Sequence, residues 1–158
     1  MATLEYLVSV GALLRFDADL EADEQPRRLI YVTPDFDQWL NAVAPTLPKD
    51  RGRALTPLAQ VDALFHDFVI GRPMVYDVDR KRLDPQRDNV WELKSEDLRI
   101  MGWFPSKGVF IAVTAAMRKR LKPFAAYAPF IAQVVAYRDA LDLDEPKTTL
   151  GVRADEVL

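Results

Sequence analysis

Three strand patterns in succession, separated by very short turns, limit the folds open to this chain. Residues 90–94 and 98–104 alternate apolar with other side chains over part of their length, and residues 109–114 are almost wholly apolar. Only residues 95–97 and 105–108 separate them. Connections this short join antiparallel neighbours, so the pattern predicts an antiparallel meander. Its third strand, apolar on both faces, is expected in the centre of the sheet or under a helix.

Helical patterns precede and follow this meander. Residues 28–32 are β-branched and aromatic and predict a strand. Thr33 and Thr56 are each followed by proline, which is typical of a helix start, because the hydroxyl caps free N–H groups and proline needs no partner there. Residues 129–141 carry an apolar stripe at helical spacing. The expected fold is α+β, a small, mainly antiparallel sheet with two N-terminal helices and one C-terminal helix.

Weaker patterns leave other segments less defined. Residues 4–14 fit a strand or a short helix, and their pattern does not decide between them. Residues 75–78 predict a weak strand, and residues 80–89 a charged loop. The length of 158 residues fits one domain. The expected divisions are an N-terminal extension (1–26) with an acidic linker, one domain (27–141) and an acidic tail without a clear element (142–158).

Composition excludes several kinds of chemistry. The chain has no cysteine and one histidine, His66, so it cannot form disulfides, thiol nucleophiles or multi-histidine zinc sites. Its six glycines are scattered and form no phosphate-binding loop, and no serine lies in a nucleophile elbow. The start of the chain lacks the basic residues of a secretory signal, and no stretch approaches the ~20 apolar residues of a membrane span. We expect a cytoplasmic protein that does not bind membranes.

The charge is distributed unevenly along the chain. The net charge is -3, yet residues 80–138 contain 12 Lys and Arg against 5 Asp and Glu. A local excess of this size can attract an anionic polymer such as nucleic acid. The same residues also fit an ordinary solvated surface of mixed charge.

The order of motifs in residues 90–138 carries the most information about function. They are Val-Trp-Glu-Leu-Lys (90–94), Leu-Arg-Ile-Met-Gly-Trp-Phe (98–104), Val-Phe-Ile-Ala-Val (109–113), a basic run (118–122) and a helix led by Pro129 that contains Ile131, Ala132 and Arg138. This order resembles the RelE/HigB-type toxins of bacterial toxin–antitoxin systems, particularly the phage-derived branch. The resemblance covers about residues 28–141 and implies a RelE-like fold.

The resemblance implies a ribosome-dependent mRNA endonuclease, which a cognate antitoxin, expected to be a small helix-turn-helix protein, would neutralise by covering its basic face. The implied partners are therefore this antitoxin, the ribosome and mRNA, and no cofactor or metal is implied. Attack by the neighbouring 2′-hydroxyl on a phosphate requires a base, cations that stabilise the transition state, and an acid for the leaving oxygen.

The family pattern assigns these roles to basic residues. Lys94 and Arg99 are expected on the same face of neighbouring strands, with Arg99 binding the phosphate and Lys94 acting as a second cation or as the base. Arg138, on the last helix, completes the expected catalytic set. The expected RNA-binding residues are Lys107, Arg118, Lys119, Arg120, Lys122 and Tyr127. In the structural alternative, the strand cations are exposed and pair with Glu92, Glu96 and Asp97.

The sequence also departs from the family pattern, and this keeps other functions open. Leu98 stands where an aromatic residue is usual, and Arg-Lys-Arg (118–120) replaces a Phe-x-Lys-Lys pattern. One alternative is a catalytically silent RelE-like module that binds a protein or nucleic acid. Another is a small-molecule pocket beneath aromatic side chains that are more often core residues, namely Trp91, Trp103, Phe104 and Phe110.

Overall fold

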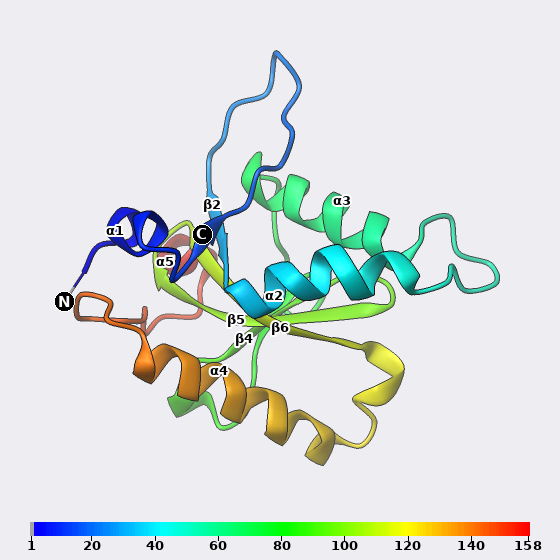
Figure 1. The fold of residues 1–158 in the computed structure, drawn as a ribbon. Helices are drawn as coiled ribbons and strands as arrows, with labels where there is room; N and C mark the ends of the chain where they lie inside the picture. The colour runs from blue at the N-terminus through cyan, green and yellow to red at the C-terminus, as the bar shows by residue number, and fades with distance from the viewer. Residues whose placement is uncertain (1) are drawn as a thin grey trace.

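Six strands form one open sheet in the computed structural model, which describes residues 2–158 (Figure 1). Their order is β1-β2-β6-β5-β4-β3, and only the pair β2–β6 is parallel. The strands are β1 (Leu14–Arg15), β2 (Leu29–Val32), β3 (Arg80–Arg82), β4 (Trp91–Lys94), β5 (Leu98–Ser106) and β6 (Val109–Met117). The α-helices are α1 (Leu4–Ser9), α2 (Pro34–Gln38), α3 (Pro57–Val69), α4 (Ala128–Ala140) and α5 (Ala154–Val157).

The predicted meander is confirmed. Strands β4, β5 and β6 are successive antiparallel neighbours, and the apolar β6 lies inside the sheet between β5 and β2. The expected α+β class with a mainly antiparallel sheet is therefore correct.

Helices cover both faces of the sheet. Figure 1 shows α2 and α3 on one side, here called the α3 face, and α4 on the other, the α4 face. Both threonine caps form: the hydroxyl of Thr33 accepts a hydrogen bond from the Phe36 N–H at 3.1 Å, and that of Thr56 accepts one from the Ala59 N–H at 3.2 Å. Beyond α2 the chain continues through a π-helical turn (Trp39–Val43) and a 3-10 turn (Ala44–Thr46).

Each face has its own apolar core. Fully buried aromatic residues fill the α3 face, among them Phe36, Phe65, Phe68, Trp91, Phe104 and Phe110. The core of the α4 face includes Met101, Trp103, Ile111, Ile131 and Val134. The period-2 alternation of β4 and β5 therefore determines which side chains each layer buries.

The charged segment 80–89 is a correction to the sequence analysis, because its first three residues form β3 while residues 75–78 form a turn with one isolated bridge. Arg80 is 3% exposed, lies over the rings of Tyr76 and Trp91, and donates a hydrogen bond to the Met74 carbonyl oxygen. A buried arginine of this kind is stabilised by hydrogen bonds to carbonyl oxygens and by contact with the faces of aromatic rings. Hydrophobic alternation could not reveal a strand that packs through such a residue.

The segments near both ends of the chain contribute to the packing. Residues 4–14, whose type the sequence left open, form α1 and begin β1, and their Leu7 and Leu13 are buried. In the acidic tail, α5 buries Val157 completely, and the Val157 carbonyl accepts a hydrogen bond from the Gly108 N–H. These contacts add an edge strand and a short helix to the domain.

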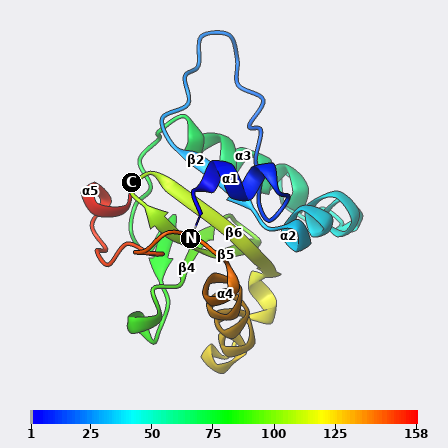
Figure 2. The ribbon, with the colours of Figure 1, turned by 60° about the vertical axis from the view of Figure 1, so that its left-hand side comes forward.

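The acidic loop between β1 and β2 projects from the sheet and is tied to α3 (Figure 2). Glu24 Oε1 lies 2.9 Å from His66 Nε2, and this contact raises the pKa of His66. A raised pKa means that the contact stabilises the fold fully below the usual histidine pKa and is lost as pH rises through the raised value. In NMR titrations we expect the pKa of His66 to fall in Glu24→Gln, and the Tm difference between wild type and this variant to be larger at pH 5.5 than at pH 8. Equal differences at both pH values would contradict the linkage.

A glycine sets the spacing of the two central strands. A Cβ on Gly102 would collide with the carbonyl oxygen of Ile111 and lie 3.0 Å from the ring of Phe110. Strand backbone cannot move aside without breaking the sheet, so we expect Gly102→Ala to destabilise the protein by roughly 3 kcal/mol or more. Urea unfolding measures this loss. A variant within about 1 kcal/mol of wild type would show that β5 and β6 are not packed this closely.

Candidate functional site

The structure brings Lys94 and Arg99 together. They are directly opposed in the register of β4 and β5. Their neighbours Leu93 and Leu98 are buried in the core of the α3 face, so both cations project from the α4 face. The short turn of residues 95–97 thus places two positive charges side by side at one end of the sheet.

Two further side chains complete a group that we call the polar cluster, made of Glu92, Lys94, Arg99 and Tyr127. Glu92 is two residues before Lys94 on β4 and therefore shares its face. Tyr127 ends the 3-10 turn before α4 (Phe124–Tyr127), and the pKa of its hydroxyl is influenced by burial and the nearby Glu92, which raise it, and by Arg99, which lowers it. Strand β3 adds Lys81 directly opposite Glu92.

Glu92 is the buried carboxylate of the polar cluster. It is 2% exposed, and its Oε2 has no hydrogen-bond partner among residues 2–158. Burial raises the pKa of Glu92, against the opposing effects of the Tyr127 hydroxyl and the charges of Lys94 and Arg99. Burial and the charge of Glu92 also raise the pKa of the Tyr127 phenol. A carboxyl whose pKa is raised toward neutrality is suited to accept and release protons.

Lys94 is surrounded by acceptor oxygens. Its Nζ donates a hydrogen bond to the Asp77 carbonyl oxygen at 2.9 Å and lies 3.6 Å from Asp77 Oδ1 and 3.9 Å from Glu92 Oε1. Its side chain is only 15% exposed. Because two carboxylates surround the ammonium group, Lys94 fits the role of second cation, and Glu92 is the better candidate for the base.

Arg99 is held by backbone carbonyl oxygens. Its Nη1 donates to the carbonyl oxygens of Ser95 at 2.7 Å and Leu98 at 2.9 Å. Within the described part of the chain, no Asp or Glu forms an ion pair with it. A guanidinium that is positioned by backbone carbonyls and forms no ion pair can bind a phosphate.

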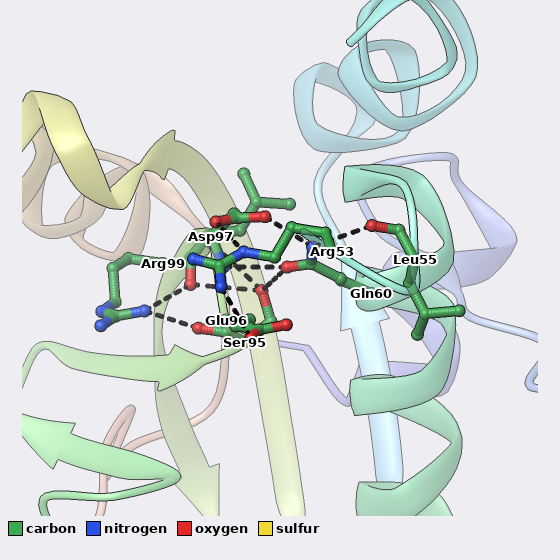
Figure 3. A network of polar contacts seen from close by, with 8 residues as sticks. Arg53, Leu55, Gln60, Ser95, Glu96, Asp97 and Arg99 are labelled. Atoms are coloured by element: carbon green, nitrogen blue, oxygen red, sulfur yellow. Dashed lines mark hydrogen bonds and ion pairs between the residues drawn. The ribbon is translucent and has the colours of Figure 1, made fainter. Parts of the chain in front are cut away.

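A network of buried polar groups fixes the turn from which Arg99 projects (Figure 3). The side-chain oxygen of Gln60 accepts hydrogen bonds from the Asp97 N–H at 2.9 Å and the Ser95 hydroxyl at 3.1 Å, while its nitrogen donates to Asp97 Oδ2 at 2.8 Å. Arg53 Nε donates to Asp97 Oδ1 at 3.0 Å. Burial opposes the charge of Asp97, but the hydrogen bonds from Gln60 and Arg53 outweigh it and lower the pKa of Asp97.

Removing Gln60 tests this network. We expect Gln60→Ala to destabilise the protein by about 2–4 kcal/mol, because the change leaves the buried Asp97 N–H and Asp97 Oδ2 without their Gln60 partners. Thermal or urea unfolding measures the loss. Gln133, exposed on α4, provides the control: Gln133→Ala is expected to stay within about 0.5 kcal/mol of wild type. Equal stabilities of the two variants would contradict a structural role for the network.

Three of the predicted RNA-binding cations lie beside this turn. Arg118, Lys119 and Lys122 line a cavity of about 230 Å³ together with Arg53 and Asp97. The Arg118 N–H donates to the Asp97 carbonyl oxygen at 2.7 Å, which joins the basic run to the end of β5 that carries Arg99.

The remaining predicted RNA-binding cations are not brought to the polar cluster. Arg120 lies on the α3 face, where it lines a cavity with Trp39 and Leu98. Lys107 is exposed in the turn at the opposite end of β5 from Arg99. The aromatic side chains weighed as a ligand pocket (Trp91, Trp103, Phe104 and Phe110) are completely buried and belong to the two cores.

The placement of Arg138 corrects its expected catalytic role. Arg138 is 9% exposed, and its Nη1 donates to the carbonyl oxygens of Asp88 at 2.6 Å and Asn89 at 3.4 Å. It also lies eleven residues beyond Tyr127, which is about 16 Å along a helix. Its guanidinium therefore fastens the loop before β4 to α4, and the polar cluster contains Tyr127 from this region instead.

Sequence reasoning placed Glu92 only as an ion-pair partner of the strand cations. The sequence feature that could have placed Glu92 in the site is its spacing of two residues from Lys94, which puts both side chains on one face of a strand. Burial raises the pKa of Glu92, and Tyr127, which is 35 residues away in sequence, opposes that rise; no local pattern reports this contact.

Two kinds of feature are absent from the described residues. Residues 2–158 contain no group of three or more His, Cys, Asp and Glu side chains placed to hold a metal ion. No helix in this range is both long and apolar enough to span a membrane.

Comparison with known proteins supplies no relative for this arrangement. No protein-family model, curated protein or solved structure matches the chain.

Proposed function

We propose that the chain is a toxin-type endoribonuclease of the RelE/HigB kind, with a RelE-like fold, that cleaves mRNA on the translating ribosome. The observation that carries the proposal is the polar cluster, in which two cations and a buried carboxyl of raised pKa share one face of β4 and β5, next to the phenol of Tyr127 from the turn before α4. Cleavage through the 2′-hydroxyl needs these kinds of group and no metal.

The proposed reaction forms a bond between the 2′-oxygen and phosphorus and breaks the bond from phosphorus to the 5′-oxygen. Tyr127 accepts the proton of the 2′-hydroxyl while its own proton passes to the carboxylate of Glu92. Arg99 stabilises the added negative charge on the phosphate oxygens. The ammonium group of Lys94 donates a proton to the leaving 5′-oxygen. The products are a 2′,3′-cyclic phosphate and a free 5′-hydroxyl, so atoms and charge balance.

The surroundings of the polar cluster support an RNA substrate. Arg118, Lys119 and Lys122 are exposed next to the turn that positions Arg99 and can bind the flanking phosphates. In this proposal the protein acts in the cytoplasm, and a cognate antitoxin neutralises it by covering these cations.

Expression in a bacterial host tests the proposal. Wild-type protein is expected to stop growth and to cut transcripts only within translated regions, whereas Arg99→Ala combined with Lys94→Ala restores growth. Arg72→Ala is a suitable control, because Arg72 is an exposed cation that follows α3 and pairs with Asp67. Wild-type expression without a growth or cleavage phenotype would count against the proposal.

A second candidate function is a RelE-like module that binds RNA or a protein without cutting. The observation in its favour is the ion pairing of Lys94 with Asp77 and Glu92, which offsets part of its charge. This function predicts salt-sensitive association with RNA that leaves the RNA intact.

A further inference from the structure

A second surface, which shares only Tyr127 with the polar cluster, lies between α4 and the loop of residues 84–88. It is a groove of about 610 Å³ that we call the α4 groove. Its walls are mostly apolar, and they include Phe124, Ile131 and Val135. Phe124 is 62% exposed although its ring lies 6.0 Å from that of Tyr127, and such exposure of a large aromatic side chain is typical of an interaction surface.

Helix α4 carries apolar residues both on the side that packs against the sheet and on the outer side that lines the groove. Ile131 and Val134 are buried against the sheet, yet the outer side that lines the groove carries the exposed Ala132 and Ala136 in place of polar residues. Surface helices normally oppose an apolar stripe with a polar one. Together with Ala128, these alanines are spaced four residues apart, so a second helix can approach α4 closely along its length.

Acidic side chains surround the apolar floor of the groove. Asp84, Asp88 and Asp139 all line it, and none of the three carboxylates forms an ion pair within residues 2–158. Arg138 holds the two walls together through its 2.6 Å hydrogen bond to the Asp88 carbonyl oxygen. The groove is therefore an apolar channel whose rim carries three carboxylates that form no ion pair with any of residues 2–158, although the Lys147 ammonium donates a hydrogen bond to the Asp139 carbonyl oxygen at 3.2 Å.

We infer that the α4 groove binds a basic amphipathic helix of a partner protein. Aliphatic side chains on one stripe of that helix cover Phe124 and the alanines, and lysine or arginine on the flanks meets the three carboxylates. The 13 residues of α4 extend over about 20 Å, which corresponds to three to four turns of the bound helix. The inference stands on the groove alone and does not require that the chain cleaves RNA.

Peptide binding tests this inference on the full chain. The probes are a panel of fluorescent helical peptides with leucine at one stripe and lysine on both flanks, varied in length and register, together with charge-reversed versions that carry glutamate. Fluorescence anisotropy is expected to show binding of at least one lysine peptide, weakened by added salt, and no binding of its glutamate version. Failure of every lysine peptide, or equal binding of both charge types, would overturn the inference.

Variants locate the binding. The triple change Asp84→Asn, Asp88→Asn and Asp139→Asn is expected to weaken the peptide by roughly ten-fold or more. A control triple with the same change in net charge uses exposed carboxylates elsewhere, namely Glu5→Gln, Glu21→Gln and Asp23→Asn. Equal losses in the two triples would show that the attraction is general and not specific to the groove.

Two more variants separate the groove from the polar cluster. Ala132→Phe fills the groove from an exposed helical position, so the protein is expected to fold and to lose peptide binding. Arg99→Ala is expected to keep it. Unchanged binding in Ala132→Phe would show that the peptide binds elsewhere. Loss of RNA cleavage in Arg99→Ala without loss of peptide binding would concern only the proposed nuclease function.

Discussion

Replacing Arg99 with alanine is expected to reduce RNA cleavage by about 10²–10³-fold or more, because the guanidinium is the one cation of the polar cluster without an ion-paired carboxylate. The transition state carries more negative charge on the phosphate than the substrate does, so the loss is expected in kcat more than in KM. Cleavage of a labelled mRNA in a purified translation system measures both constants.

Two further variants make the Arg99 result specific. Arg99→Lys keeps the charge but loses the paired donors of the guanidinium, so we expect intermediate activity. Arg72→Ala removes an exposed cation after α3 and is expected to cleave like wild type. Equal activity of Arg99→Ala and wild type would remove Arg99 from the mechanism, and equal losses in Arg99→Ala and Arg72→Ala would indicate a general effect of charge.

Glu92→Gln is expected to lower cleavage by about 10²–10⁴-fold, because a buried amide cannot take the proton that Tyr127 passes on. In this mechanism Glu92 is a positioning and proton-accepting residue behind Tyr127, not a group that contacts RNA. Tyr127→Phe removes the relay itself and should give a loss of similar size. If both variants cleave at the wild-type rate, the relay is wrong.

The pH dependence separates proton transfer from a purely structural role of Glu92. Burial raises the pKa of Glu92, and the carboxylate must be ionised to act as a base. Wild-type activity should therefore fall as pH decreases through a value above the usual ~4.3 of glutamate, and this acid limb should be missing in Glu92→Gln.

Stability provides an independent check on Glu92. A raised pKa means that the folded protein binds the proton more tightly, so burial of the charged form costs stability as pH rises through that value. Neutral glutamine avoids this cost, and Glu92→Gln is expected to be at least as stable as wild type at pH 7. A destabilised Glu92→Gln variant whose acid limb is unchanged would show that Glu92 is only a structural residue.

The parts of the fold that local patterns could predict are those built from regular apolar spacing. The meander of β4, β5 and β6, the strand at residues 29–32 and the helices α3 and α4 all follow from such spacing and from threonine caps. Strand β3 was missed because it packs through Arg80, whose guanidinium is stabilised by the Met74 and Val152 carbonyl oxygens and by the rings of Tyr76 and Trp91. Helix α5 was missed because it is four residues long and is held mainly by Val157.

The candidate site was predictable to the same extent. The face shared by Lys94 and Arg99 follows from strand alternation and a short turn, so the pair could be expected before the structure was known. The contributions of Gln60, Glu92 and Tyr127 depend on contacts between segments far apart in the chain. Arg138 was misassigned for the same reason, since only the structure shows that its guanidinium meets the carbonyl of Asp88.

The chemical nature of the cut ends in RNA tests the central claim most directly. Wild-type protein, added to a purified translation system with a defined mRNA, is expected to produce 3′ ends that carry a 2′,3′-cyclic phosphate and 5′ ends with a free hydroxyl. A 2′-deoxy substitution at the cut position should abolish cleavage there, and Arg99→Ala should leave the mRNA intact. Intact mRNA with folded wild-type protein, or ends with a 5′-phosphate, would contradict cleavage by the 2′-hydroxyl at the polar cluster.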